Sequence, residues 1–256
     1  MLKGRLAVIK GLLFDLNGTV VDILTDESNY DVYRIMANLL SYQGVYLSSD
    51  EVRQLYFSYN KEQRKSSSEA YPEFDVEAIF AKIIDTYATD KTKALPKNMR
   101  KSLPRFLAET FRAATMFKLS LYDGVRKVLD ELKPKYRLAA VSDGQKLWAE
   151  PEMQRVGLGD DFEFVLVSGK YGYRKPDLRI YQKALKKMRL KPDEVLFVGN
   201  DMYRDVFGAH EAGMKTIFFK SNQGDHKSYG VEPDYIIYDF KQLPQAVDFL
   251  AAKAEN

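Results

Sequence analysis

Apolar residues along the chain change their spacing twice, and the spacing predicts three regions. Residues 6–14 (LAVIKGLLF) form a short, mostly apolar run, which predicts a buried strand. From about Val21 to Lys118 the apolar residues follow helical spacing, with almost no strand-like stretch. After Leu121, strand-like and helix-like segments alternate. The pattern therefore predicts an α/β region that is interrupted near its start by a helical one.

The helical region is expected to contain four helices. Apolar residues recur on one face of the first helix, and Gly44 is a typical stop. Ser48 and the acidic residues after it are typical of a helix N-terminus, and the polar run 66–69 predicts a loop. The predicted helices span residues 26–44, 48–65, 75–88 and 96–115.

The region after Leu121 has the alternation that is typical of a doubly wound, mostly parallel sheet. Strands are predicted at residues 137–143, 162–169, 194–201, 215–220 and 234–239, and helices at 125–134, 179–190 and 203–213 and at the C-terminus. The first strand belongs to the same sheet, because a strand followed only by helices has nowhere else to be buried. We therefore predict an α/β core, residues 1–20 and 119–256, with an inserted all-helical cap, residues 21–118.

Polar residues follow three of the predicted strands, and ligands of open α/β sheets bind beyond the carboxyl ends of the strands. The residues at those ends are Asp15, Ser142, Asp143, Gly144, Asn200 and Asp201, with Asp205 one helical turn after Asp201. Lys175 stands directly before Pro176, at the predicted start of a helix, where proline is well tolerated. We expect these side chains to gather at one edge of the sheet.

The chemistry of this group of residues suits phosphoryl transfer. Carboxylates are the oxygen ligands that Mg²⁺ prefers, and a hydroxyl and an ammonium group suit the oxygens of a phosphoryl group. An Asp beside a metal ion can attack phosphorus and form an aspartyl-phosphate. The backbone amides of the turn at residues 16–19 add donors for an anion.

Four motifs carry a resemblance to a known family. In chain order they are FDLNGTVVD, AAVSDG, GYRKPD and VLFVGNDMYRD, and GAHEAGM follows the last. Together they resemble the haloacid dehalogenase superfamily, in particular its phosphatase-like members with a helical (C1-type) cap inserted after the first motif. The likeness covers the core from the first strand to the GAHEAGM helix, and the cap by position only.

The resemblance implies a role for each matching residue. It makes Asp15 the nucleophile and, with the backbone carbonyl of Asn17, a ligand of Mg²⁺. It makes Asp201 a further metal ligand and Asp205 one that binds directly or through water. The residues that it places around the phosphoryl group are Gly18, Thr19, Ser142, Asp143, Gly144 and Lys175, of which Ser142 and Lys175 grip the group and Thr19 braces the loop.

The chain departs from the family pattern at two positions. Phosphatases of the family carry a second acid two residues after the nucleophile, and this chain has Asn17 there. An amide cannot take or give the proton, and losing a general acid–base group costs about 10²- to 10⁴-fold in rate. In the last motif the residue after Gly is most often Asp, and here it is Asn200, with Asp201 next to it.

Three functions fit this combination. The first is a slowed Mg²⁺-dependent phosphatase that acts on a small phosphomonoester. The second is a pseudo-enzyme or regulatory module that binds a phosphorylated ligand. The third is a 2-haloacid dehalogenase, whose chemistry needs no second acid and which does not depend on Mg²⁺, whereas this chain keeps Asp201 and Asp205. We expect the phosphatase.

The composition of the chain limits its possible partners and the kinds of site it can contain. The 256 residues hold 39 basic and 36 acidic side chains without a dense Lys/Arg run, so we expect no nucleic-acid partner. There is no Cys, which excludes disulfides, thiolate metal sites and Cys nucleophiles. No apolar stretch reaches the roughly 18–20 residues of a membrane span, and we expect a cytoplasmic enzyme with no membrane partner. Nothing in the sequence sets an oligomeric state.

Overall fold

In the computed structural model of the protein, which describes residues 8–255, six parallel strands form the centre. The sheet order is β5-β4-β1-β6-β7-β8, and every neighbouring pair is parallel. In that order the strands are Val165–Val167, Arg137–Ser142, Gly11–Phe14, Val195–Gly199, Lys215–Phe219 and Tyr235–Ile237. The predicted fold class is confirmed.

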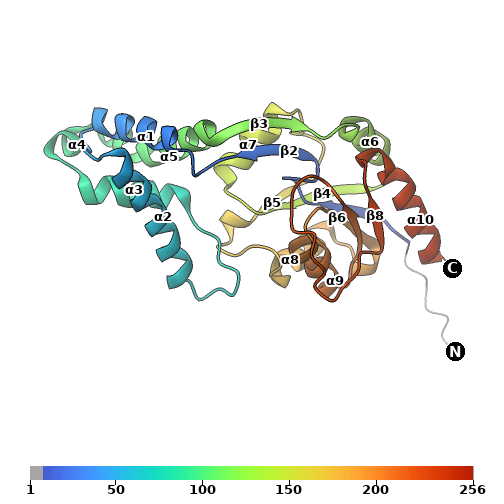
Figure 1. Cartoon of the computed structure of the whole chain (residues 1–256). Helices are drawn as coiled ribbons and strands as arrows, with labels where there is room; N and C mark the ends of the chain where they lie inside the picture. The colour runs from blue at the N-terminus through green and yellow to red at the C-terminus, as the bar shows by residue number, and fades with distance from the viewer. Residues whose placement is uncertain (1–7, 256) are drawn as a thin grey trace.

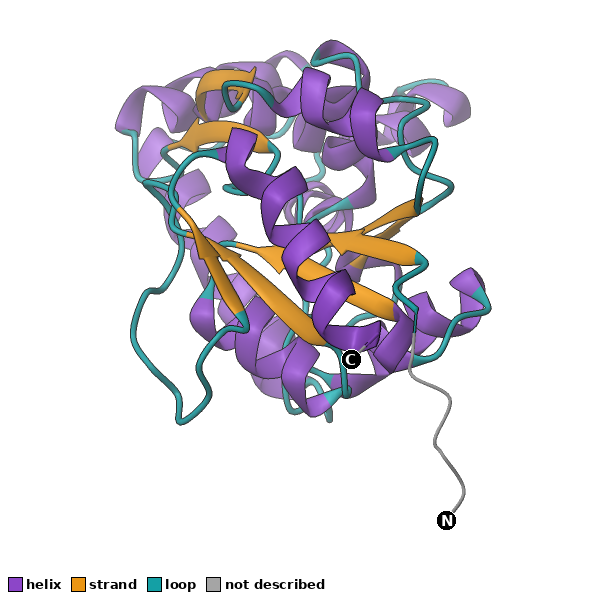
Figure 2. Cartoon of the chain, turned by 90° about the vertical axis from the view of Figure 1, so that its right-hand side faces the viewer, coloured by secondary structure: helices purple, strands orange, loops and turns teal. Residues whose placement is uncertain are grey.

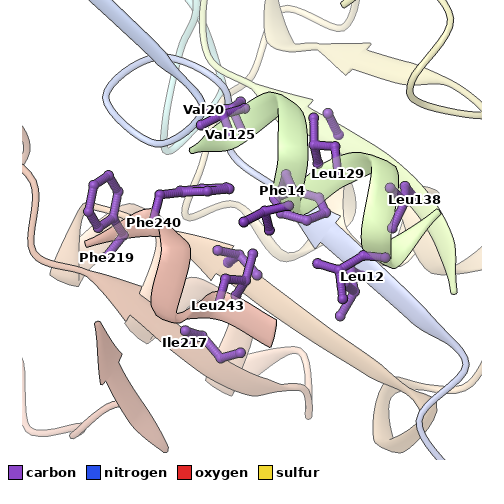
Figure 3. Close-up of a cluster of buried hydrophobic side chains, with 14 of the residues drawn as sticks. Leu12, Phe14, Val20, Val125, Leu129, Leu138, Ile217, Phe219, Phe240 and Leu243 are labelled. Carbon is purple, nitrogen blue, oxygen red and sulfur yellow. The ribbon is translucent and has the colours of Figure 1, made fainter. Parts of the chain in front are cut away.

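Helices cover both faces of this sheet (Figure 2). Side chains of a strand alternate between its faces, so Leu12 and Phe14 of β1 point to one side and Leu13 to the other. The first side is covered by α6 (Val125–Leu132) and α10 (Leu243–Glu255), whose apolar residues pack on Phe14 and its neighbours (Figure 3). The second side is covered by α8 (Leu178–Met188) and the short α9 (Gly208–Glu211).

The register of the three central strands decides where their ends lie. Phe14, the last residue of β1, pairs with Ala140 of β4 and with Val198 of β6. The chain therefore leaves β1, β4 and β6 at nearly the same level of the sheet. This alignment brings three of the predicted motifs together at the carboxyl edge.

Five helices between β2 and β3 form the cap, which lies at one end of the molecule (Figure 1). They are α1 (Tyr30–Tyr42), α2 (Ser49–Ser66), α3 (Val76–Tyr87), α4 (Asp90–Ala94) and α5 (Lys97–Thr115). The cap has an apolar core of its own, to which the core helix α7 (Lys146–Arg155) adds the buried Trp148 and the partly buried Leu147. The inserted helical region is confirmed, but the short helix α4 was not predicted.

A two-stranded antiparallel ribbon joins the cap to the core. It consists of β2 (Val21–Thr25) and β3 (Met116–Leu121), although the spacing of apolar residues predicted helix throughout 21–118. That prediction was wrong at both ends of the region. The two strands are stabilised by pairing with each other across the whole cap, and no pattern of neighbouring residues marks either of them as a strand. Strand β3 crosses the proposed limit between residues 118 and 119, and β2 begins directly after the limit at residue 20; the domain limits stay a prediction.

Other elements differ from the predicted ones in length or kind. The first strand begins at Gly11, so residues 8–10 of the predicted strand lie outside it, and residues 6–7 lie outside the described residues. Helix α7 was not predicted, and Pro151 lies inside it. The predicted helix at 203–213 is a π-helical segment, Met202–Phe207, that leads into α9. Within residues 8–255 no helix is long and apolar enough to cross a membrane.

Candidate active site

Asp15, Lys175 and Asp205 meet at the carboxyl edge of the sheet. The ammonium nitrogen of Lys175 lies 2.6 Å from Oδ1 of Asp15 and 2.6 Å from Oδ1 of Asp205. All three side chains are buried. Burial opposes the charge of Lys175, but the neighbouring carboxylates of Asp15, Asp205 and Asp143 outweigh it and raise the pKa of Lys175. The lysine is therefore a fixed cation between two carboxylates.

Thr19 links the first and the last motif. Its hydroxyl lies 3.1 Å from Oδ2 of Asp15 and 3.1 Å from Oδ1 of Asn200. Gly18, which directly precedes Thr19 in the turn, has a positive φ of 85°, and a Cβ atom there would collide with the side chain of Asn200. The hydroxyl of Thr19 therefore holds the amide of Asn200 close to Asp15.

The second motif lies at the end of β4. Ser142 is buried there, and Oδ1 of Asp143 accepts a hydrogen bond of 3.0 Å from the backbone N–H of Lys175. The other oxygen of Asp143, Oδ2, is buried without a hydrogen bond, and its nearest cationic atom is Nη1 of Arg204 at 3.7 Å. Burial raises the pKa of Asp143, against the effect of Lys175 and Arg204. Asp143 thus fixes the backbone of Lys175 to the turn that follows Ser142.

Asp205 braces the turn after β6. Its Oδ2 accepts the backbone N–H groups of Asn200 at 2.9 Å and Asp201 at 3.0 Å, while Oδ1 faces Lys175. Burial raises the pKa of Asp205 to about 6, with Asp15 adding to the rise and Lys175 opposing it. Both oxygens of Asp205 are therefore engaged by groups of the protein.

Asp201 caps the π-helical segment that follows it. Its Oδ1 accepts the N–H groups of Tyr203 and Arg204, and its Oδ2 accepts the Arg204 guanidinium at 2.9 and 2.7 Å and the N–H of Asp225 at 3.1 Å. Burial opposes its charge, but Arg204 prevails and lowers the pKa of Asp201. A part for Asp201 in metal binding stays a prediction, and it requires that the pair with Arg204 opens.

The oxygen donors nearest to Asp15 suit a hard cation. Asp15 supplies a carboxylate, and Asn200 supplies an amide oxygen held by the same hydroxyl of Thr19. Among residues 8–255 no group of three His, Cys, Asp or Glu residues has the arrangement of a metal site. The Thr19 hydroxyl thus places one carboxylate, that of Asp15, and one neutral amide oxygen, that of Asn200, near each other. A part for the backbone carbonyl of Asn17 in metal binding stays a prediction.

Three residues of this region had no place in the sequence-based picture. Arg204 grips Asp201, Gln145 follows the second motif, and Glu73 reaches over from the cap. Arg204 could have been found from the sequence, because it stands three residues after Asp201, at a spacing at which charged side chains of a helix pair. The contacts of Gln145 and Glu73 join segments about 70 to 95 residues apart in the chain, and no local pattern marks them.

Comparison with known proteins agrees with the motifs. A model of the haloacid dehalogenase-like hydrolase family matches residues 12–219. Glyceraldehyde 3-phosphate phosphatase of Pyrococcus furiosus is 36% identical over 129 residues, which are 50% of this chain and 53% of that protein. The chain spans about half the length of the curated relatives it matches first.

Two solved structures with similar folds cover nearly the whole chain. The 2-haloacid dehalogenase of Pseudomonas syringae pv. Tomato DC3000 has a TM-score of 0.68 at 20% identity, over 94% of this chain and 99% of that one. YfnB of Bacillus subtilis, a putative hydrolase bound to magnesium, has a TM-score of 0.55 at 18% identity, over 94% and 99%. At these identities the likeness concerns the fold alone.

Proposed function

Because the chain belongs to the haloacid dehalogenase-like hydrolase family, we propose that it is a Mg²⁺-dependent phosphatase acting on a small phosphomonoester. The observation that carries the proposal is the placement of Asp15. It follows β1 at the centre of the sheet, and Lys175 and Thr19 hold its two oxygens. The similar protein of Pyrococcus furiosus is named a glyceraldehyde 3-phosphate phosphatase, and glyceraldehyde 3-phosphate is a small phosphomonoester.

In the proposed reaction Asp15 is the nucleophile. Its carboxylate oxygen forms a bond to phosphorus while the ester P–O bond breaks, and the leaving alkoxide takes a proton. Water then attacks the aspartyl-phosphate, the bond between phosphorus and the Asp15 oxygen breaks, and phosphate leaves. Lys175 and Ser142 neutralise and bind the oxygens of the phosphoryl group, and Gly18, Thr19, Asp143 and Gly144 shape the turns around it.

Asn17 limits the two proton transfers in this scheme. The amide cannot protonate the leaving oxygen or activate the water. Both steps then depend on solvent or on a good leaving group, and we expect turnover about 10²- to 10⁴-fold below that of an otherwise equal enzyme with an acid there. Binding and nucleophilic attack use Asp15 and Lys175, which the amide leaves intact.

Mg²⁺ is the cofactor we propose, and when bound it would neutralise charge on the transferring phosphoryl group. The structure of YfnB contains magnesium. In this chain Asp15, the carbonyl of Asn17 and the amide oxygen of Asn200 are the groups suited to hold it. Asp205 would act through its backbone contacts or through water, and Asp201 only after release from Arg204.

A phosphate-release screen tests the function. The protein is assayed over a set of metabolite phosphates, with Mg²⁺ and with chelator. Phosphate release that requires Mg²⁺ supports the phosphatase. No turnover, with thermal stabilisation by a phosphorylated ligand, would instead identify a binding module, and chelator-insensitive halide release from 2-haloacids would identify a dehalogenase.

Asn17→Asp is expected to raise kcat about 10²- to 10⁴-fold, because it restores a group that can exchange protons at the reacting oxygens. The measurement is initial-rate kinetics on the best substrate of the screen. Asn17→Ala is the matched control, since it alters the same side chain without adding an acid. A rate for Asn17→Asp within twofold of the wild-type rate would contradict a missing acid as the limit on turnover.

Asn200→Asp is expected to tighten Mg²⁺ binding about tenfold, because a second carboxylate beside Asp15 adds charge to a hard-cation site. Asp201→Asn is expected to change it little, since the carboxylate of Asp201 is held by Arg204. Isothermal titration of the substrate-free protein with Mg²⁺ measures both. The opposite ranking, a large loss in Asp201→Asn and no gain in Asn200→Asp, would show that Asp201 turns toward the metal.

A further inference from the structure

A short segment of the cap is bound directly to the core beside the candidate site. This segment, residues 71–76, consists of the end of the loop between α2 and α3 and the first residue of α3, and we refer to it as the strap. The backbone N–H of Glu73 donates to the carbonyl of Gly172 at 2.9 Å, and that of Arg174 donates to the carbonyl of Tyr71 at 2.9 Å. The strap thus forms an isolated antiparallel bridge, between Pro72 and Tyr173, with the chain that leads into Lys175.

This pairing lies next to the fixed lysine of the site. Arg174, whose N–H the strap accepts, is the residue directly before Lys175. The N–H of Lys175 in turn donates to Asp143, and its ammonium group to Asp15 and Asp205. Two consecutive backbone amides are therefore held, one by the cap and one by the second motif.

Glu73 connects the strap to the turn after Ser142. Its side chain is 3% exposed, and its Oε2 accepts a hydrogen bond of 2.7 Å from the hydroxyl of Ser168. The oxygen of that hydroxyl accepts the backbone N–H of Gly144 at 2.9 Å. A carboxylate of the cap thereby reaches, through one serine, the glycine of the second motif.

Gln145 makes the converse contact, from the core to the strap. Its buried side chain donates to the carbonyl of Phe74 at 2.6 Å and accepts the N–H of Val76 at 3.3 Å. Gln145 directly follows Gly144, so both neighbouring residues of the turn are tied to the cap. Its amide satisfies one donor and one acceptor of the strap, which an apolar or a charged residue would not do.

We propose that Glu73 and Gln145 are positioning residues, through which docking of the strap sets the geometry of the turn at residues 142–145 and of Lys175. Neither residue touches the reacting atoms. The catalytic consequence rests on the proposed phosphatase function, whereas the structural coupling does not. The candidate site is then fully assembled only while the cap is docked on the core.

Amide hydrogen exchange in the substrate-free protein tests the coupling. In Glu73→Ala and in Gln145→Ala we expect the N–H groups of Gly144 and Arg174 to exchange about tenfold faster than in the wild type, because each variant removes buried hydrogen bonds that hold the acceptors of these amides, the Ser168 hydroxyl and the strap, in place. Unfolding midpoints, measured alongside, show that the variants are folded. Unchanged exchange at both amides in two folded variants would overturn the proposal.

Two matched variants separate positioning from general loosening of the cap. Glu73→Gln keeps an acceptor for the Ser168 hydroxyl, and we expect it to restore slow exchange at Gly144. Glu69→Gln removes the exposed ion pair between the cap loop and Arg179, and we expect no change at the two amides. Fast exchange in Glu73→Gln, or in Glu69→Gln, would overturn the roles assigned to Glu73 and to the strap.

Kinetics on the best phosphate ester of the screen then test the consequence. Glu73→Ala and Gln145→Ala are expected to lower kcat/KM about tenfold, with Glu73→Gln and Glu69→Gln close to the wild type. If exchange responds as expected and the wild type releases no phosphate, the proposed function fails and the coupling stands. If the wild type is active and kcat/KM stays unchanged in both alanine variants, the positioning role is overturned.

Discussion

Asp15→Asn is expected to lower phosphate release by about 10⁴-fold or more, because an amide cannot form the acyl-phosphate bond that the mechanism requires. The substitution fits the structure. An amide oxygen can still face the ammonium of Lys175, while the amide nitrogen donates to the hydroxyl oxygen of Thr19, whose proton then goes to Asn200. The loss therefore concerns the nucleophile and not the fold. The measurement is phosphate release at saturating substrate.

The control for this variant is a buried aspartate away from the site. Asp161 is buried beside Arg126, with 2.8 Å between the charged groups, and precedes β5, so it lies at the opposite end of the strands from Asp15. Asp161→Asn is expected to keep kcat within about threefold of the wild type, because it can change the stability of the protein but removes no group that takes part in the reaction. Residual activity of Asp15→Asn above a tenth of the wild-type rate would rule out Asp15 as the nucleophile.

The placement of three motif residues at one edge of the sheet could be predicted from the sequence. Asp15, Ser142 and Asp201 each follow an apolar run, and parallel strands in one sheet end at one edge. The alignment of β1 with β4 and β6 then follows from packing of their apolar residues between two helix layers. Lys175 was predicted from its motif, and the structure brings it to Asp15.

The direction in which each side chain points at that edge could not be predicted from the sequence. Asn200 and Asp201 are neighbours, so a turn that aims one toward Asp15 must aim the other elsewhere. The amide of Asn200 faces Thr19, and the carboxylate of Asp201 caps its own helix and pairs with Arg204. The motif shows both residues, but the hydrogen bonds of the turn decide which one points into the site.

The missed elements share a physical cause. The ribbon of β2 and β3 is stable only because its strands pair across the whole cap, from Val21 to Leu121. Helix α7 contains a proline, which lowers the local preference for helix, and it is held by Trp148 and Glu152 against cap helix α5. Tertiary contacts decide these elements, so patterns along the chain do not reveal them.

Lys175→Met is expected to lower the free energy of unfolding by about 3–5 kcal/mol at neutral pH, because it removes the cation from a buried cluster of carboxylates. Asp15 and Asp205 each lie 2.6 Å from this ammonium group and are buried, so neither can regain its charge partner from solvent. The variant is expected to be inactive as well. Urea unfolding at fixed temperature measures the change.

The loss in free energy of unfolding caused by Lys175→Met should become smaller as the pH falls. Burial already raises the pKa of Asp205 to about 6, above its unfolded value, and loss of Lys175 removes the group that opposes this rise. A carboxyl with a raised folded-state pKa destabilises the fold above that pKa and ceases to do so as pH falls and it takes up a proton. We therefore expect the difference in free energy of unfolding between Lys175→Met and the wild type to decrease as the pH is lowered from 8 to 5.

Two further variants show whether buried charge causes the loss. Adding Asp205→Asn to Lys175→Met removes one of the unpaired carboxylates and is expected to recover part of the stability at neutral pH. Lys118→Met removes a half-exposed lysine from its pair with Asp22, and we expect a change below about 1 kcal/mol. An equal loss of stability in the Lys118 and Lys175 variants, or a difference from the wild type that widens toward pH 5, would contradict the role of Lys175 as the cation that pairs with two buried carboxylates.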